Sequence, residues 1–263
     1  MSRRAAQLDA SGVLTTAVVV ATWEGNPPRY LRGLLESFER YDAGLLFRPF
    51  LVVNGHGYPL DASIAACFER VLERENTGFN LGAWDHAWRA LGDCERFLFL
   101  QDDCFARRRN WLRDIALRFD RTPRCGLVGE QIQRNFDRPW SELVVARSAT
   151  LTSRRVSASV AARARYYREK LREWGIHEGR AARHVTTVVQ YTSREVLEDV
   201  GGYDLVSNYE DAIAAEIGFS CKLTARGYAL AQVGRRRHAR IGHREWSDDG
   251  FAARLRRSIE KRM

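Results

Sequence analysis

Hydrophobic positions in the first hundred residues follow two alternating patterns. Mostly apolar runs, rich in β-branched or aromatic side chains, occupy residues 13–21, 50–53 and 96–100. Runs this short are typical of strands buried on both faces of a sheet. Between the first two runs, apolar side chains recur with helical spacing at Leu31, Leu34, Leu35 and Phe38. The pattern predicts a strand, a helix and a second strand.

The alternation continues with a helix at 61–70, a short strand ending near Glu75 and a helix at 81–91. Four strands with intervening helices predict an α/β fold with an open, mostly parallel central sheet flanked by helices. In such sheets, ligands bind outside the carboxyl ends of the strands. We therefore expect the functional residues directly after the apolar runs, in segments 22–26, 54–57, 76–82 and 101–104.

The second half of the chain is less regular. Residues 131–150 are polar, with one short apolar patch, and allow no firm assignment. The later elements predicted are a helix at 155–174, a strand at 185–191, a helix, a turn at 201–204, a helix from about Glu210 and a strand at 228–233. We interpret residues 1–263 as one domain with a regular first half at 13–130, an irregular second half at 131–244 and a basic C-terminal helix at 245–263.

Composition supports a folded chain, because 263 residues with 45% hydrophobic content can bury a substantial core. The apolar stretch at 17–21 is far shorter than the roughly 20 residues that span a bilayer, so we expect a soluble, cytoplasmic protein. The five cysteines form no CxxC pair and are predicted to be buried free thiols, not a disulfide framework or a zinc cluster.

The net charge of +9 favours partners that carry phosphate, such as a nucleotide, a nucleic acid, a lipid phosphate or an anionic membrane. Arginines cluster at 107–109, 154–172 and 235–237. One hypothesis is peripheral contact of the amphipathic helix and the basic tail with the inner face of an anionic membrane. Nucleic acid is disfavoured, because no nucleic-acid-binding motif is present and the strand ends carry acidic residues.

Two adjacent carboxylates, Asp102 and Asp103, follow the buried run that ends at Leu100. Like charges this close repel unless a cation lies beside them, and carboxylate oxygens are ligands that Mg²⁺ and Mn²⁺ prefer. A solvated loop that caps the next helix is the alternative interpretation of the same two residues.

Four segments, in the following order along the chain, carry further motifs. They are 18–26, 52–55, the Asn76-x-Gly78 element within 75–82, and 98–103, which a Trp111-Leu112 pair follows. Together they resemble glycosyltransferase family 2 of the GT-A fold. The second half adds Gly201-Gly202-Tyr203-Asp204, Glu210-Asp211 and Arg226-Gly227-Tyr228, which are similar to the family's later motifs.

The resemblance implies a metal-dependent transfer of a sugar from a nucleotide-diphosphate donor to an acceptor hydroxyl, with inversion at the sugar. It makes 13–130 the nucleotide-sugar-binding half and 131–244 the acceptor half. Asp211 of the Glu210-Asp211 pair would be the general base. Asp103 would bind Mn²⁺ or Mg²⁺, with His238 or His243 as a further ligand, and Asp102 would contact the ribose or a metal-bound water. The nucleoside would lie against Thr22, Glu24, Asn54, Asn76, Gly78 and Asn80.

Gln101 departs from the family pattern, which has an acid at that position, and this removes one carboxylate from the metal site. A protein that binds a nucleotide sugar without turning it over therefore remains an alternative. A nucleotidylyltransferase of related architecture is an alternative enzyme class. It is disfavoured because it needs a Gly-rich, Arg-containing loop after the first strand, and residues 21–26 do not form one. A glycan, a lipid-linked molecule and a small molecule all remain open as the acceptor.

Overall fold

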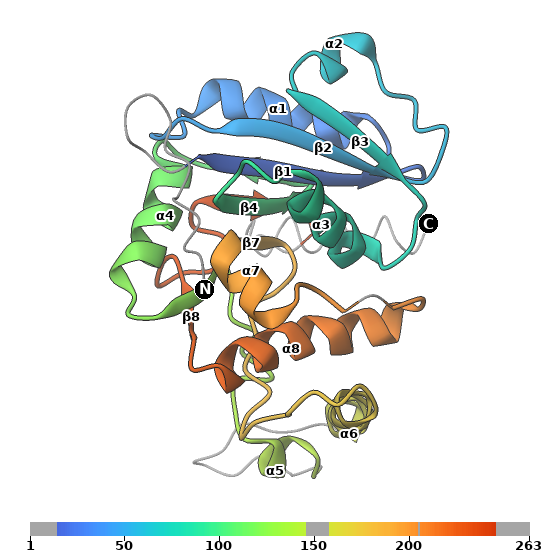
Figure 1. Cartoon of the computed structure of the whole chain (residues 1–263), viewed down its shortest axis with the longest axis vertical. Helices are drawn as coiled ribbons and strands as arrows, with labels where there is room; N and C mark the ends of the chain where they lie inside the picture. The colour runs from blue at the N-terminus through green and yellow to red at the C-terminus, as the bar shows by residue number, and fades with distance from the viewer. Residues whose placement is uncertain (1–14, 146–157, 205, 246–263) are drawn as a thin grey trace, which may run out of the picture.

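The computed structural model describes residues 15–145, 158–204 and 206–245. Its centre is a seven-stranded sheet with the order β3-β2-β1-β4-β7-β6-β8 (Figure 1). In that order the strands span Arg70–Arg74, Arg48–Asn54, Thr16–Trp23, Arg96–Gln101, Val189–Ser193, Cys125–Gly129 and Ala229–Gln232. Only β7 runs antiparallel to its two neighbours; the other pairs in this sheet are parallel. The predicted α/β class with a mostly parallel sheet is confirmed.

The two central strands are buried along nearly their whole length, which explains their unbroken apolar sequences. Residues 17–20 of β1 and 97–100 of β4 are fully buried. The register aligns Ala21 with Gln101 and Trp23 with Asn54. The carboxyl ends of β1, β2 and β4 therefore meet at one edge of the sheet, as expected for a parallel arrangement.

Two groups of helices cover the sheet. Helices α1 (Arg29–Arg40) and α4 (Trp111–Arg121) are joined by the stacked rings of Phe38 and Trp111, whose centroids are 4.8 Å apart. The second group contains α3 (Phe79–Ala90), α7 (Arg194–Val200) and α8 (Tyr209–Ala225). Trp84 of α3 stacks on Phe99 of β4 at 5.5 Å and anchors this group to the sheet.

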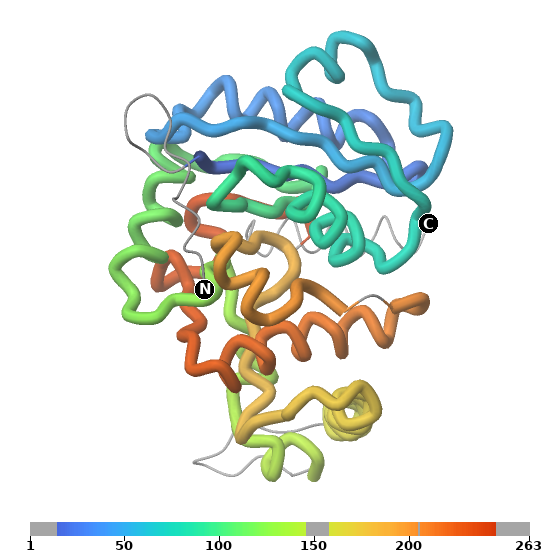
Figure 2. Tube along the Cα trace, viewed as in Figure 1, coloured from blue at the N-terminus to red at the C-terminus, as the bar shows by residue number. Residues whose placement is uncertain are grey.

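Helices α5 (Trp140–Leu143) and α6 (Ala158–Glu173) lie beyond α8, at the end of the molecule farthest from β3 (Figures 1 and 2). Tyr167 and Leu171 of α6 belong to a second hydrophobic cluster with Ile217 of α8. The predicted apolar stripe of α6 is thus packed on protein. Contact with a membrane would have to involve other residues.

Several element boundaries differ from the sequence prediction. The helix predicted at 61–70 is only α2 (Ala62–Ala65), because the chain enters β3 at Arg70. The strand predicted at 185–191 begins at Val189. A ribbon of β5 (Cys104–Ala106) and β9 (Ile241–His243) was not predicted. The basic helix predicted for 245–263 lies outside the described residues beyond Glu245.

The cysteine prediction is right for four of five side chains. Cys94, Cys104, Cys125 and Cys221 are buried, and all five cysteines are free thiols. Cys67 is exposed, so the prediction is wrong there, because it follows the short α2 at the surface. Within the described residues, no helix combines the length and the apolar character needed to cross a bilayer.

Candidate functional site

Asp102 is directed into the protein at the carboxyl end of β4. Thr22 Oγ1 donates a 2.6 Å hydrogen bond to its Oδ2, and Asn26 Nδ2 donates a 2.8 Å bond to its Oδ1. The side chain is 2% exposed, and this burial raises its pKa to about 6, although the Thr22 hydroxyl acts in the opposite direction. Both carboxylate oxygens are thus engaged by the end of β1 and the loop that follows it. The predicted ribose contact of Asp102 stays a prediction.

Asp103 has a different environment from its neighbour. Its Oδ1 is buried and accepts no hydrogen bond from any described residue, yet it lies 2.9 Å from His243 Nε2. The same ring nitrogen lies 3.0 Å from Gln101 Oε1, and one nitrogen cannot serve both oxygens well. Gln101 Nε2 donates to the Thr187 carbonyl at 2.9 Å, which fixes the amide. Three polar side chains therefore converge at one point, those of Asp103, Gln101 and His243.

The pairing of β5 with β9 brings His243 to this point, because it aligns Cys104 with His243. His238 faces elsewhere: its Nε2 lies 3.2 Å from Gln131 Oε1, and its buried Nδ1 has no hydrogen bond within the described residues. Burial, followed by repulsion from His243, lowers the pKa of His238 to about 4. Of the two candidate histidines, the structure places His243 beside Asp103.

No group of three or more His, Cys, Asp or Glu side chains in residues 15–145, 158–204 and 206–245 could hold a metal ion. Asp103 was predicted with either His238 or His243 as a further ligand, and that pairing stays a prediction. Because His243 Nε2 is shared between Asp103 Oδ1 and Gln101 Oε1, it cannot satisfy both buried oxygens, and a cation beside Asp103 would satisfy the carboxylate. In this respect Asp103 and His243 fit a divalent cation that takes its further ligands from a bound substrate.

Asp211 lies in the first turn of α8 with both oxygens engaged. Tyr166 Oη of α6 donates a 2.7 Å hydrogen bond to Oδ1, and Asn208 Nδ2 donates a 2.7 Å bond to Oδ2. Asn208 also caps the helix, because its Oδ1 accepts from the Asp211 backbone N–H. These bonds fix the direction of the carboxylate. Glu210 is exposed on the same turn.

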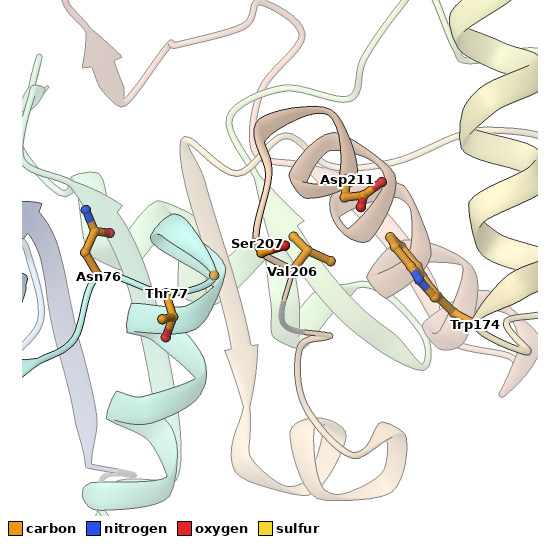
Figure 3. A pocket seen from close by; sticks show the side chains of 7 residues that line it. Asn76, Thr77, Trp174, Val206, Ser207 and Asp211 are labelled. Carbon is orange, nitrogen blue, oxygen red and sulfur yellow. The ribbon is translucent and has the colours of Figure 1, made fainter.

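Asp211 lines a pocket of about 480 Å³ between the two halves of the chain. Asn76, Thr77 and Gly78 form one wall, and Trp174, Val206 and Ser207 accompany Asp211 on the other (Figure 3). Gly78 has φ +71°, a left-handed conformation that favours glycine. The predicted residues Asn76, Gly78 and Asp211 thus meet at one cavity.

The remaining predicted nucleoside contacts hold the surrounding loops. Asn54 is 2% exposed, accepts a 2.6 Å bond from Arg74 and donates to the Phe79 carbonyl at 3.1 Å. Glu24 accepts a 3.1 Å bond from the His56 backbone N–H. Asn80 lies in the first turn of α3 and does not line the pocket.

The Gly201 to Asp204 turn links α3 to α8. The Tyr203 backbone N–H donates a 3.0 Å bond to Asp85 Oδ1, and Lys222 donates to the Gly202 carbonyl at 2.8 Å. A Cβ atom on Gly202 would lie 2.3 Å from Asp85 Oδ1, so the glycine is required by packing. This turn leads directly to the segment that presents Asp211.

Sequence reasoning missed several residues that shape the site. Tyr166 and Trp174 carry no motif, and their roles depend on contacts between distant segments. Arg74 braces the 76–78 turn, because it donates to the Thr77 carbonyl and to Thr77 Oγ1 at 2.9 Å each, and burial lowers its pKa. Glu130 comes directly after the apolar strand β6. A carboxylate after an apolar run is the same signal that identified Asp102.

Glu130 is a buried acceptor that holds the segment before β9. Its two oxygens accept backbone N–H bonds of 2.7, 2.8 and 2.7 Å from Ala239, Arg240 and Ile241. Burial raises its pKa to about 7, although these three bonds act in the opposite direction. The contact connects β6 to the strand that carries His243.

No protein-family model matches the chain, and no curated protein matches its sequence. Among solved structures, the fold is similar to the mannosyltransferase PcManGT from Pyrobaculum calidifontis in complex with GDP-Man and Mn²⁺. The similarity has a TM-score of 0.50 at 16% sequence identity and covers 82% of this chain and 54% of that chain. This chain has a glycosyltransferase-like fold. It spans about half the length of PcManGT, and at this identity the likeness concerns the fold alone.

Proposed function

We propose that the protein is a glycosyltransferase, similar to family 2, that transfers a sugar from a nucleotide-diphosphate donor to an acceptor hydroxyl. The main support is the position of Asp211, which lines a pocket whose opposite wall is the 76–78 turn after β3. That turn lies at the edge of the sheet where α/β proteins bind nucleotides. A carboxylate of fixed direction therefore faces the side on which a donor would bind.

The candidate cation ligands are Asp103 of the donor half and His243, which the pairing of β9 with β5 brings beside it from the end of the second half. When bound there, Mn²⁺ or Mg²⁺ would offset the negative charge that develops on the departing nucleoside diphosphate. Gln101 contributes a neutral oxygen instead of a carboxylate, so fewer protein charges would hold the cation. The diphosphate of the donor would complete the ligand set, which is common for Mg²⁺ sites.

Asp211 is the proposed general base. It would accept the proton of the acceptor hydroxyl as that oxygen forms a bond to the anomeric carbon and the bond to the diphosphate breaks. Attack from the face opposite the leaving group inverts the configuration at the sugar. Tyr166 and Asn208 hold the carboxylate for this step, and such positioning lowers the entropic cost of the reaction.

Thermal unfolding against a panel of nucleoside diphosphates, each with and without Mn²⁺, tests the donor site. A ligand that binds only the folded state raises the unfolding midpoint. We expect a Mn²⁺-dependent rise for at least one nucleotide, which Asp103→Ala abolishes and Asp211→Asn retains. Absence of a rise for every nucleotide in the wild-type protein would contradict the proposal.

Gln101 favours a second candidate, a nucleotide-sugar-binding protein without turnover. Both candidates expect the same thermal shift, so product formation distinguishes them. Incubation with the sugar conjugate of the bound nucleotide should release free nucleoside diphosphate in the presence of an acceptor. Tight binding without any release, for transfer or for hydrolysis, would favour the second candidate.

A further inference from the structure

The acceptor side of the pocket has an aromatic face next to the proposed base. Trp174 follows the last turn of α6, and its ring packs against both hydrophobic clusters while part of it lines the pocket. Figure 3 shows the indole and Asp211 on the same wall, across from Asn76 and Thr77. Because the ring is held by the core, the pocket contains a rigid flat surface beside a carboxylate.

Two further aromatic residues, Phe79 and Tyr209, lie close in sequence to residues that line the pocket. Phe79 begins α3 directly after Gly78, and Tyr209 begins α8 two residues before Asp211. Their ring centroids are 6.4 Å apart in an edge-to-face arrangement, and the residues are 37% and 67% exposed. Phe79 has φ +53°, a strained conformation for a residue with a side chain. Exposed aromatic residues at strained positions are typical of binding sites.

The polar lining limits what the pocket can hold. Ser207 and Asp211 place hydrogen-bonding groups beside the aromatic face, and Asn76 and Thr77 line the opposite wall. An acyl chain would bury these groups without partners, which is costly. A ligand that suits both features has an apolar face and a hydroxylated edge.

We propose that the pocket binds a pyranose ring of a saccharide acceptor, which stacks on Trp174 and turns one hydroxyl toward Asp211. The ring C–H groups carry a small positive partial charge, which complements the negative face of the indole. The ring hydroxyls match the polar lining, and the volume of about 480 Å³ is in the range of small-molecule sites. This inference rests on the proposed transfer reaction and specifies the chemical class of its acceptor.

Saturation-transfer NMR with the methyl glycopyranosides of glucose, mannose, galactose and N-acetylglucosamine tests the inference on the full chain. The measurements are made with Mn²⁺ and each nucleoside diphosphate present. We expect transfer to ring C–H protons for at least one glycoside. Failure of all four glycosides to bind the wild-type protein would overturn the inference.

Trp174→Phe and Trp174→Leu form a matched pair, because both keep an apolar side chain against the clusters and only Phe keeps an aromatic face. The Leu variant should bind the glycoside at least about tenfold more weakly, and the Phe variant should stay within about threefold of wild type. Equal affinity in the Leu variant and the wild type would overturn the inference.

The nucleotide-induced thermal shift separates this inference from the proposed function. Both Trp174 variants should retain that shift, which verifies their fold and donor site. Glycoside binding without any nucleotide shift in the wild-type protein would refute the transfer reaction and leave a saccharide-binding pocket. A nucleotide shift without glycoside binding would refute only the saccharide acceptor.

Discussion

Tyr166 Oη donates a 2.7 Å hydrogen bond to Asp211 Oδ1 and so joins α6 to the first turn of α8. The other carboxylate oxygen is held by Asn208 of the loop before α8. Asp211 is thus oriented by two donors from different segments. Such hydrogen bonds maintain the direction of a carboxylate, which a general base requires.

Tyr166→Phe removes only the hydroxyl that holds Asp211. The loss of one hydrogen bond of about 1.4 kcal/mol predicts a fall in kcat of about tenfold, because the base is less often aligned. Nucleotide affinity should not change, since Tyr166 does not line the pocket. Initial rates of sugar transfer and a nucleotide titration measure the two quantities. An unchanged kcat would show that the orientation of Asp211 does not depend on Tyr166.

Asp211→Asn keeps the shape of the side chain and removes its basicity. General base catalysis contributes about 10²- to 10⁴-fold, so kcat should fall by that factor while the nucleotide-induced thermal shift is retained. Glu210→Gln is the informative comparison, because its side chain is exposed on the same turn. A larger loss in the Glu210 variant than in the Asp211 variant would reassign the base.

The two histidines near the candidate cation site should differ in their effect on Mn²⁺. His243→Ala removes the ring that lies 2.9 Å from Asp103 Oδ1, so we expect the Mn²⁺ concentration for half-maximal nucleotide shift to rise about tenfold or more. His238→Ala should change this concentration less, because its ring faces Gln131. A titration of the thermal shift with Mn²⁺ measures both variants, and the reverse ranking would contradict the assignment.

Glu130→Gln should change the pH dependence of stability. The folded carboxyl has a pKa of about 7 against an ordinary value of 4.5, so the folded state holds the proton to higher pH than the unfolded state. The stability contributed by Glu130 is therefore present below about pH 4.5 and is lost as pH rises toward 7, by an amount on the order of 3 kcal/mol.

Denaturant titrations of wild type and Glu130→Gln at several values between pH 4.5 and pH 8 measure this effect. The free energy of unfolding of the wild type relative to the variant should fall across that interval and then become constant. Asp102 and His238 titrate in the same range but are present in both proteins, so their effects cancel. A difference that does not vary with pH would show that Glu130 is ionised throughout.

The elements that were predicted well are those whose signals are local. The continuous apolar sequences of β1 and β4 identified the centre of the sheet, and the position after β4 identified Asp102 and Asp103. Their separate environments could not be predicted, because the register of β4 against β1 brings Asp102 to Thr22, and β9 brings His243 to Asp103. Three-residue strands such as β5 and β9 have no periodicity to detect.

The acceptor side was harder to predict for a related reason. Asp211 was found through its motif, but Tyr166 is 45 residues away and contacts it only because α6 packs on α8. Trp174 is the last residue of the helix predicted at 155–174, and its contact with the pocket is visible only in the structure. Packing between helices decides such roles, and a single sequence does not specify which helices meet.

The antiparallel strand β7 lies between β4 and β6, so one hydrogen-bonded sheet runs through both halves of the chain. Moving the halves apart as rigid bodies would break the five residue pairs between β4 and β7. The sheet is therefore a fixed frame for the pocket. In the proposed transfer reaction, the donor and acceptor sides would be held at a constant separation from binding of the substrates to release of the products.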